Sequence, residues 1–199
     1  MAAVLDSVRA LFAPKNETAF RIDAENPSDV VARERLLDRM MGPNRKKKSS
    51  EALRRNRVPA EGLALVARDT SGHLIGTVRL WNIDAGITRD GTKVPALLLG
   101  PLAVDCEHEG KGIGATLMRA AILEAKKRGH GAILLVGDAA YYERFGFSAE
   151  KTATLMMPGP FARERFLALE LTDRWLDGAA GVLVASGRKL TDAGMKKAA

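Results

Sequence analysis

Residues 98–114 read LLGPLAVDCEHEGKGIG, an apolar run followed by a polar segment and three glycines in five positions. The glycines open a predicted amphipathic helix over residues 110–129, whose apolar face carries Ile113, Leu117 and Ala121. Glycines at a strand-to-helix turn let backbone N–H groups approach a ligand closely. A helix N-terminus adds unpaired donors and the positive end of the helix dipole. The stretch therefore predicts a phosphate or pyrophosphate site, with a ligand-free tight turn as the alternative.

Two common phosphate motifs do not fit this turn. The Walker A pattern fails because Gly110-Lys111 is followed by Gly112 rather than Ser or Thr, and Asp105 stands at its first glycine. The dinucleotide fingerprint is matched formally by Gly110, Gly112 and Ala115. However, the polar residues 105–109 separate the glycines from the strand, and the motif lies far from the start of the chain.

A third motif fits better. Residues 109–114, Glu-Gly-Lys-Gly-Ile-Gly, resemble motif A of the GNAT superfamily of acyl-CoA-dependent N-acyltransferases, which reads Gln/Arg-x-x-Gly-x-Gly/Ala before a long helix. Residues 98–104, with Gly-Pro-Leu-Ala-Val at their end, look like the fourth strand of that superfamily. This chain departs from the motif at Glu109, a negative charge that would repel a pyrophosphate. We therefore expect Glu109 to point outward.

A second segment resembles the same superfamily. Residues 140–147, Ala-Tyr-Tyr-Glu-Arg-Phe-Gly-Phe, resemble its motif B. The longer run from Gly137, with residues 157–160 and the strand 167–171, is similar to a bacterial subgroup of YhbS-like acetyltransferases. The resemblance covers residues 19–171. Two motifs in the expected order with a predicted strand between them are a stronger indication than either alone.

The resemblance implies an acetyl-CoA-dependent N-acetyltransferase that acts on a primary amine by direct attack in a ternary complex. Tyr142 matches the general acid of the family, and with an ordinary pKa of about 10 it would hold its proton at neutral pH. Tyr141 is the alternative acid, in which case Tyr142 packs. The backbone of the fourth strand would bind the pantetheine arm and the oxyanion. The residues implied in acetyl-CoA binding are Leu102, Ala103, Val104, Glu109, Gly110, Lys111, Gly112, Ile113, Gly114, Ala115, Asp138, Tyr141 and Phe145.

No general base emerges from the sequence. The predicted strand 97–104 contains no Asp, Glu or His, so a carboxylate there has no match. The candidates elsewhere, acting directly or through water, are Asp84, Asp105, His108 and Glu143. No His, Cys or carboxylate spacing suggests a metal site, and none is expected.

The order of predicted elements indicates a mixed α/β domain of the GNAT type: a central twisted sheet of about six or seven strands flanked by helices. We predict a helical extension over residues 1–16, the acyltransferase domain over 17–178, and a partly mobile tail over 179–199. The extension would pack on the domain or on a second subunit, which leaves a homodimer open. The predicted helices are 1–14, 29–41, 49–57, 110–129 and 138–146. The predicted strands are 18–22, 63–68, 74–83, 94–104, 132–136, one from 147, and 166–171, with loops at 44–48 and 84–92.

Composition limits the remaining possibilities. Hydrophobic residues make up 46% and charged residues 28% of the 199 residues, as in ordinary globular proteins. A single cysteine, Cys106, permits no intramolecular disulfide and favours a reducing, cytoplasmic compartment. No apolar run approaches the length of a membrane span.

The net charge of +7 belongs to one segment. Residues 33–57 hold ten Lys and Arg but only three acidic residues, so the rest of the chain is balanced. The segment reads either as a solvated loop between two helices or as a patch that attracts an acidic ligand. We expect the first two helices and the 84–92 loop to surround the acceptor. A basic patch there would favour an acidic amine as the acceptor. The alternative functions are an acyl-CoA-binding regulatory domain without turnover and a nucleic-acid binder, which the scarcity of aromatics near the patch disfavours.

Overall fold

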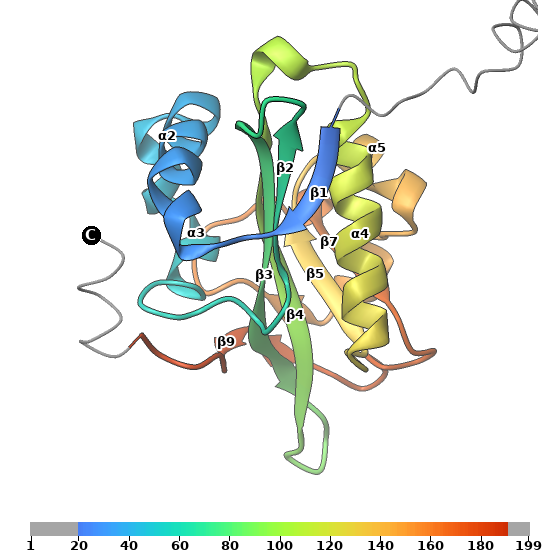
Figure 1. Ribbon diagram of the computed structural model, residues 1–199. Helices are drawn as coiled ribbons and strands as arrows, with labels where there is room; N and C mark the ends of the chain where they lie inside the picture. Colours follow the sequence, from blue (N-terminus) through green and yellow to red (C-terminus); the bar gives the residue numbers. More distant parts are fainter. Residues whose placement is uncertain (1–19, 191–199) are drawn as a thin grey trace, which may run out of the picture.

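A twisted seven-stranded sheet runs through residues 20–190, the part of the chain that the computed structural model describes (Figure 1). In this sheet the strands Lys93–Val104 and Ala132–Val136 are parallel, and every other neighbouring pair is antiparallel. The predicted helix 1–14 and residues 191–199 lie outside the described residues. The prediction of a mixed α/β fold with six or seven strands is confirmed. The strands follow the order β1 (Phe20–Ala24), β2 (Ala64–Asp69), β3 (Leu74–Ile87), β4 (Lys93–Val104), β5 (Ala132–Val136) and β7 (Phe166–Glu170), with β9 (Val184–Ala185) paired to β3.

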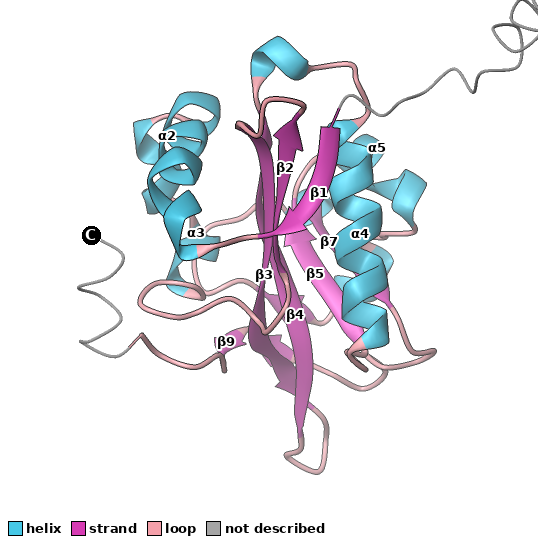
Figure 2. Ribbon diagram, in the orientation of Figure 1, coloured by secondary structure: helices cyan, strands magenta, loops and turns pink. Residues whose placement is uncertain are grey.

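Helices cover both faces of this sheet (Figure 2). One face carries α2 (Val30–Met41) and α3 (Ser49–Ala52), and the other carries α4 (Ile113–Lys127) and α5 (Ala139–Tyr142). Because successive side chains of a strand point to opposite faces, each central strand contributes residues to two hydrophobic cores, one on each face of the sheet. In β4, Leu97 and Leu99 face the α4 side while Leu98 faces the other core. Short 3-10 helices connect these elements at Pro27–Asp29, Pro43–Lys47, Cys106–His108, Glu143–Phe145, Glu150–Thr152 and Arg163–Arg165.

The helix α4 has the amphipathic pattern that the sequence predicts. Its buried residues lie on one face and pack on the sheet, and they are Ile113, Leu117, Met118, Ala121 and Ala125. Lys126 and Lys127 lie in the last turn, where cations suit the negative end of the dipole. Gly129 follows with φ of 77° and ends the helix.

The hairpin between β3 and β4 is longer than predicted. Residues 84–87 belong to β3, and only a tight turn remains, closed by Thr88 N–H donating to the Thr92 carbonyl at 2.9 Å. Residues from the C-terminal part of the chain stabilise this extension of β3, because Asp84 pairs with Val184 and Ile87 with Ala180. This turn lies at the opposite end of the sheet from the start of α4 (Figure 1), and its expected place beside the acceptor stays a prediction.

Three other local predictions are corrected. The second helix ends at Ala52 rather than Arg57, because Asn56 adopts φ of 56° and the chain becomes extended there, pairing Arg57 with Lys189. The strand expected from Phe147 is a single bridge, Ser148 to Ala168. The 44–48 loop is largely a 3-10 helix over Pro43–Lys47.

Part of the predicted C-terminal tail belongs to the packed domain. The strand β8 (Gly181–Val182) pairs with β6 (Leu155–Met156), and β9 pairs with β3. Leu183, between β8 and β9, is buried in the core on the α2 face. The pattern of residues 181–185 is too short to signal strands, since these contacts come from distant parts of the chain.

Strands β4 and β5 touch over only two residue pairs, Leu97 with Ile133 and Leu98 with Leu134. Beyond these pairs β4 continues along β3 to Val104, while β5 continues along β7 to Val136. The pairing of β4 with β3 shifts in register opposite Gly100 and Pro101. Gly100 has φ of 135°, which favours glycine, and Pro101 offers no N–H to a ladder. The sheet therefore opens where the sequence predicts a break.

Candidate active site

The opening between β4 and β5 holds a cleft of about 480 Å³. One wall is the edge of β4 that faces away from β3, where the backbone beyond Leu98 has no strand partner among residues 20–190. An unpaired strand edge presents N–H and C=O groups to which an extended ligand can add as a further strand. The lining residues are Met40, Met41, Leu102, Ala103, Val104, Glu109, Gly114, Val136, Gly137, Asp138, Tyr141, Tyr142 and Arg165.

The glycine turn forms a second recess of about 300 Å³ that shares Val104 and Gly114 with the cleft. Gly110 and Gly112 adopt φ of 75° and 76°, a conformation that other residues rarely take. A Cβ on either would meet no atom within 4 Å, so both glycines border open space. The first helical N–H bond comes from Thr116 to the Gly112 carbonyl, which leaves the earlier amides of the turn for a ligand.

The charged residues of this turn are placed as follows. Lys111 is exposed, and its Nζ lies 3.4 Å from the Glu107 carbonyl oxygen. Glu109, which we expected to point outward, is exposed but lines both recesses. Arg144, which the sequence did not single out, also lines the smaller recess and lies over the Tyr141 ring at 4.1 Å. Arg144 therefore lines the recess beside the backbone amides, whereas Lys111, though part of the turn, is not among its lining residues.

Tyr142 projects into the cleft from the end of α5. Its ring contacts Phe147 and Tyr141 edge-on, with centroids 5.9 Å and 4.9 Å away. Gly137 makes this position possible, because a Cβ there would lie 2.2 Å from Tyr142 Cε2. Burial raises the pKa of Tyr142 to about 12, so the hydroxyl keeps its proton at neutral and mildly alkaline pH. The protonated hydroxyl thus shares the cleft with the free edge of β4.

Four other residues predicted to bind acetyl-CoA differ in whether their side chains line the two recesses. Tyr141 lines both recesses, and its hydroxyl would lie 3.0 Å from a Cβ on Gly114. The backbone carbonyl of Asp138 accepts the N–H groups of Tyr141 and Tyr142 at 3.1 Å and 3.2 Å. Phe145 packs against the core and is not among the residues that line either recess. Ile113 is 1% exposed, so it reaches the turn through its backbone alone.

The candidate bases do not meet in the cleft. Asp84 pairs with Lys93 at 3.1 Å near the far end of the sheet, and Asp105 pairs with Arg39. Glu143 is exposed at the start of the 3-10 helix after α5 and lines neither recess, and His108 lines only the smaller recess. Within the described part of the chain, His108 Nδ1 is the one buried side-chain polar atom without a hydrogen-bond partner. The carboxylates that do line the cleft belong to Glu109 and Asp138.

Sequence reasoning missed Met40, Met41 and Arg165. The two methionines end α2, on the opposite face of the sheet from α4, and Arg165 precedes β7. Arg165 Nε donates to the Gly137 carbonyl at 3.3 Å, beside Tyr142. No local motif marks these residues, because each reaches the cleft only through the topology of the sheet.

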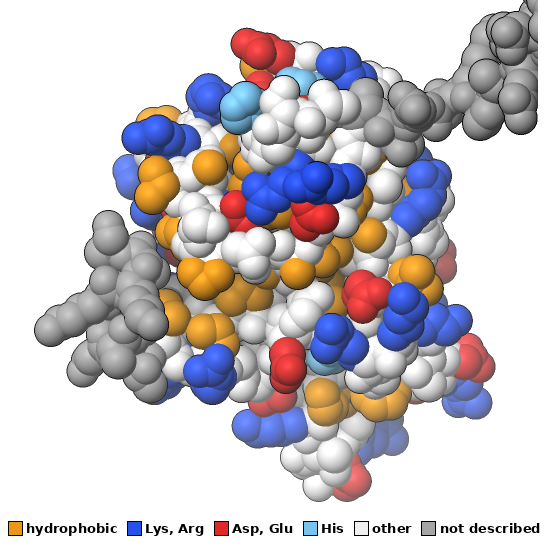
Figure 3. All heavy atoms as spheres, in the orientation of Figure 1, with side chains coloured by type: hydrophobic (Ala, Val, Ile, Leu, Met, Phe, Trp, Pro, Cys, Tyr) orange, Lys and Arg blue, Asp and Glu red, His pale blue; other side chains and the backbone are white. Residues whose placement is uncertain are grey.

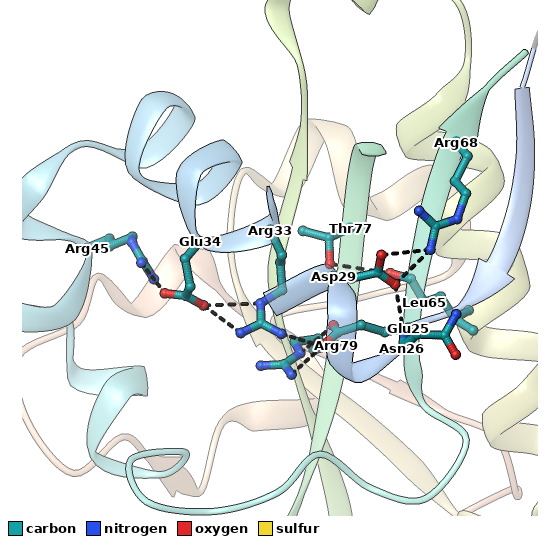
Figure 4. A network of polar contacts seen from close by, with 10 residues as sticks. All are labelled: Glu25, Asn26, Asp29, Arg33, Glu34, Arg45, Leu65, Arg68, Thr77 and Arg79. Atoms are coloured by element: carbon teal, nitrogen blue, oxygen red, sulfur yellow. Dashed lines mark hydrogen bonds and ion pairs between the residues drawn. The ribbon is translucent and has the colours of Figure 1, made fainter. Parts of the chain in front are cut away.

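The basic segment 33–57 is not the uniformly solvated surface that its composition allows. Arg33 and Arg45 are buried and join a chain of ion pairs with Glu25, Glu34 and Arg79 (Figure 4). Burial alone would raise the pKa of Glu34, but hydrogen bonds from the two arginines outweigh it and lower that pKa to about 2. On the face shown in Figure 3, Lys and Arg side chains are spread among acidic and neutral ones rather than gathered in one patch.

A family model described as "Acetyltransferase (GNAT) domain" matches residues 60–149, the segment that holds the glycine turn, Tyr142 and most of the residues that line the cleft. Residues 60–149 thus match a GNAT acetyltransferase domain, in agreement with the two motifs of the sequence. It is similar to YhbS, an uncharacterized N-acetyltransferase of Escherichia coli K12, with 29% identity over 162 residues that cover 81% of this chain and 93% of YhbS.

Solved structures agree with this assignment. The crystal structure of E. coli YhbS in complex with CoA matches with a TM-score of 0.70 and 27% identity, over 87% of this chain and 93% of that one. A GNAT family acetyltransferase from Brucella melitensis, solved with acetyl-CoA, shares the fold with a TM-score of 0.60 and 24% identity, over 83% and 94% of the two chains.

Residues 20–190 contain neither a candidate membrane span nor a candidate metal site. No helix there is long and apolar enough to cross a membrane. No group of three or more His, Cys, Asp or Glu side chains in that range is arranged to hold a metal ion.

Proposed function

We propose that this protein binds acetyl-CoA in the cleft and transfers the acetyl group to a primary amine by direct attack in a ternary complex. The observation that carries the proposal is the meeting of three elements at one opening of the sheet. These elements are the free edge of β4, the glycine turn at the start of α4, and the hydroxyl of Tyr142. The CoA complex of a relative that is 27% identical supports the ligand.

Each element has a distinct task in this reaction. The open amides at Gly110–Gly114, with Arg144 in the recess and the exposed Lys111 next to it in the turn, bind the pyrophosphate. The backbone of Leu102–Val104 pairs with the pantetheine arm and places the thioester carbonyl beside Tyr142. Holding the amine and the thioester together can supply roughly 7–11 kcal/mol of the barrier reduction.

In the chemical step, the neutral amine nitrogen attacks the carbonyl carbon, and the oxyanion accepts a hydrogen bond from a backbone N–H of β4. The C–N bond forms, and the C–S bond then breaks with its electron pair moving to sulfur. Tyr142 donates its proton to the departing thiolate. The attacking nitrogen loses its extra proton to water, or to a cleft carboxylate through water, and a proton from solvent restores the tyrosine.

The first test is ligand binding followed by turnover. Acetyl-CoA should raise the melting temperature, and a panel of primary amines should then release free CoA thiol. Gly112→Val should abolish CoA binding in a folded protein, because valine at φ of 76° is strained and would fill the open space at the turn. Stabilisation by acetyl-CoA without turnover on any amine would instead indicate an acyl-CoA-binding domain. Unchanged CoA affinity in Gly112→Val would place the site elsewhere.

The second test concerns the acid. Tyr142→Phe should lower kcat by about 10²- to 10⁴-fold while the affinity for CoA stays nearly unchanged. Because the pKa of Tyr142 is raised to about 12, the wild-type kcat should show no loss from tyrosine ionisation up to about pH 10. An unchanged kcat, with chemistry shown to limit the rate, would reject this role for Tyr142.

A further inference from the structure

A basic recess of about 490 Å³ lies beside the α2–α3 face of the sheet. Six basic residues line it, against two acidic ones, Glu34 and Glu51. Its volume falls in the range that binding sites for small molecules occupy. The basic residues are Arg45, Lys46, Arg54, Arg55, Arg57 and Arg79.

Five of these cations fall into two groups, and Arg57 donates a hydrogen bond to the Gly187 carbonyl. The inner arginines are held by carboxylates: Arg45 by Glu34, Arg79 by Glu25, and Arg54 by Glu51 at 2.7 Å. Lys46 and Arg55 are exposed and form no ion pair with any residue that the structure describes. The inner pairs build a rigid wall, and the outer cations leave a positive potential at the mouth of the recess.

The recess also has a fixed aromatic wall. Trp81 lines it, and the indole Nε1–H donates to the Gly100 carbonyl at 2.6 Å. The guanidinium of Arg79 lies over the same ring at 5.3 Å. The indole is buried beneath this guanidinium and therefore helps to fix Arg79 in the wall of the recess.

The basic recess and the catalytic cleft lie on either side of a third, narrow recess. The basic recess shares Arg54 and Pro101 with this narrow recess of about 100 Å³. That narrow recess shares Leu102 and Tyr142 with the cleft. The three recesses thus adjoin one another from the exposed cations, past the break in β4 at Pro101, to Tyr142.

We infer that the basic recess binds a carboxylate of the acceptor, so that the substrate is a small amine carrying at least one carboxylate group. This inference rests on the proposed acetyl transfer. Lys and Arg bind carboxylates through charge-assisted hydrogen bonds, and a focused positive field raises the local concentration of acidic ligands. The amine end lies in the narrow recess and faces the thioester, while the acid end stays with Lys46 and Arg55.

The first experiment measures binding without turnover. Calorimetry with CoA-saturated protein uses glutarate as the probe and glutaramide as its neutral counterpart. Glutarate should bind and glutaramide should not. Lys46→Gln and Arg55→Gln should each weaken glutarate binding about 3- to 5-fold, as loss of a partly exposed charge contact does. Lys47→Gln and Arg35→Gln are matched controls, because both residues are exposed and neither lines a recess, and they should leave the affinity unchanged.

The second experiment measures selectivity. Acceptors are offered in pairs that differ only in a carboxylate or its amide, such as 5-aminovalerate and 5-aminovaleramide. The acid should show the higher kcat/KM through a lower KM. The preference should shrink in the double variant of Lys46 and Arg55, and also at high ionic strength.

The two experiments separate the two proposals. Glutarate binding that only Lys46→Gln and Arg55→Gln weaken supports the acid site even if no amine is acetylated, and the proposed transfer then fails by itself. Acetylation of acids and amides at equal kcat/KM, with no saturable glutarate binding, overturns the inference and leaves the transfer intact. Binding of a single-stranded RNA probe that the two variants abolish, without glutarate binding, overturns it in favour of nucleic acid.

Discussion

Replacing Gly137 with alanine should move the Tyr142 ring and slow acetyl transfer. A Cβ on Gly137 would lie 2.2 Å from Tyr142 Cε2 and 2.8 Å from Cδ2, whereas ordinary contacts begin at 3.4 Å. The ring must therefore recede by about 1.2 Å, the difference between these contact distances. The backbone of Gly137 cannot give way easily, because its N–H donates to the Arg165 carbonyl at 2.8 Å.

The size of the effect follows from this displacement. A misplacement of about 1 Å in a reacting group can cost roughly 100-fold in rate. We expect Gly137→Ala to lower kcat by about 100-fold at saturating acetyl-CoA and acceptor. The assay follows release of the CoA thiol, and circular dichroism checks that the variant is folded.

Gly131→Ala serves as the matched control. A Cβ there would lie 1.9 Å from Trp175 Cδ2, a still closer clash with an aromatic ring that does not line the cleft. This variant should lose stability but keep kcat within about 2-fold of wild type. If Gly137→Ala also kept the wild-type kcat while Tyr142→Phe lost activity, the position of the ring would not matter and the reasoning would be wrong.

Two further predictions concern the buried ion pairs on the α2 face. Glu25 is 6% exposed and accepts hydrogen bonds from Arg33 and Arg79, so Glu25→Gln should cost about 3–5 kcal/mol and lower Tm by roughly 6–20 °C. Glu61→Gln, at an exposed position, is the control for thermal denaturation, and equal Tm values for the two variants would contradict the prediction. Glu34 has its pKa lowered from 4.5 to about 2, so its contribution to stability is complete above about pH 4.5 and is lost as the pH falls toward 2. The Tm difference between wild type and Glu34→Gln should shrink over that range, and a constant difference would refute the assignment.

Much of the fold was predictable because its signals are local. The helix α4 needs only the spacing of its apolar residues, and the turn at Gly110 and Gly112 needs only glycine, since both adopt positive φ. The break in β4 at Gly100 and Pro101 depends on the same kind of backbone chemistry. The family assignment rested on these segments together with the motif around Tyr142, and it is confirmed.

The long hairpin and the C-terminal strands were not predictable in the same way. Asp84 to Ile87 read as a polar loop, yet they continue β3 because residues 180–185 pair with them. A pairing between segments about a hundred residues apart leaves no periodic pattern in either of them. The strand predicted from Phe147 does not form, because only Ser148 in that segment pairs with β7, through a single bridge.

By itself, the sequence determined the glycine turn, the amphipathic helix behind it, the strand break and the tyrosine motif. Only the tertiary structure decided which charges of residues 33–57 are buried, because Arg33 and Arg45 need carboxylates on other elements. It also decided that Met41 and Arg165 reach the cleft and that a basic recess adjoins the narrow recess beside Tyr142. Backbone conformation and helical periodicity depend on neighbours a few residues away. A cleft, by contrast, forms where two strands separate, and its walls come from segments that only the folded chain brings together.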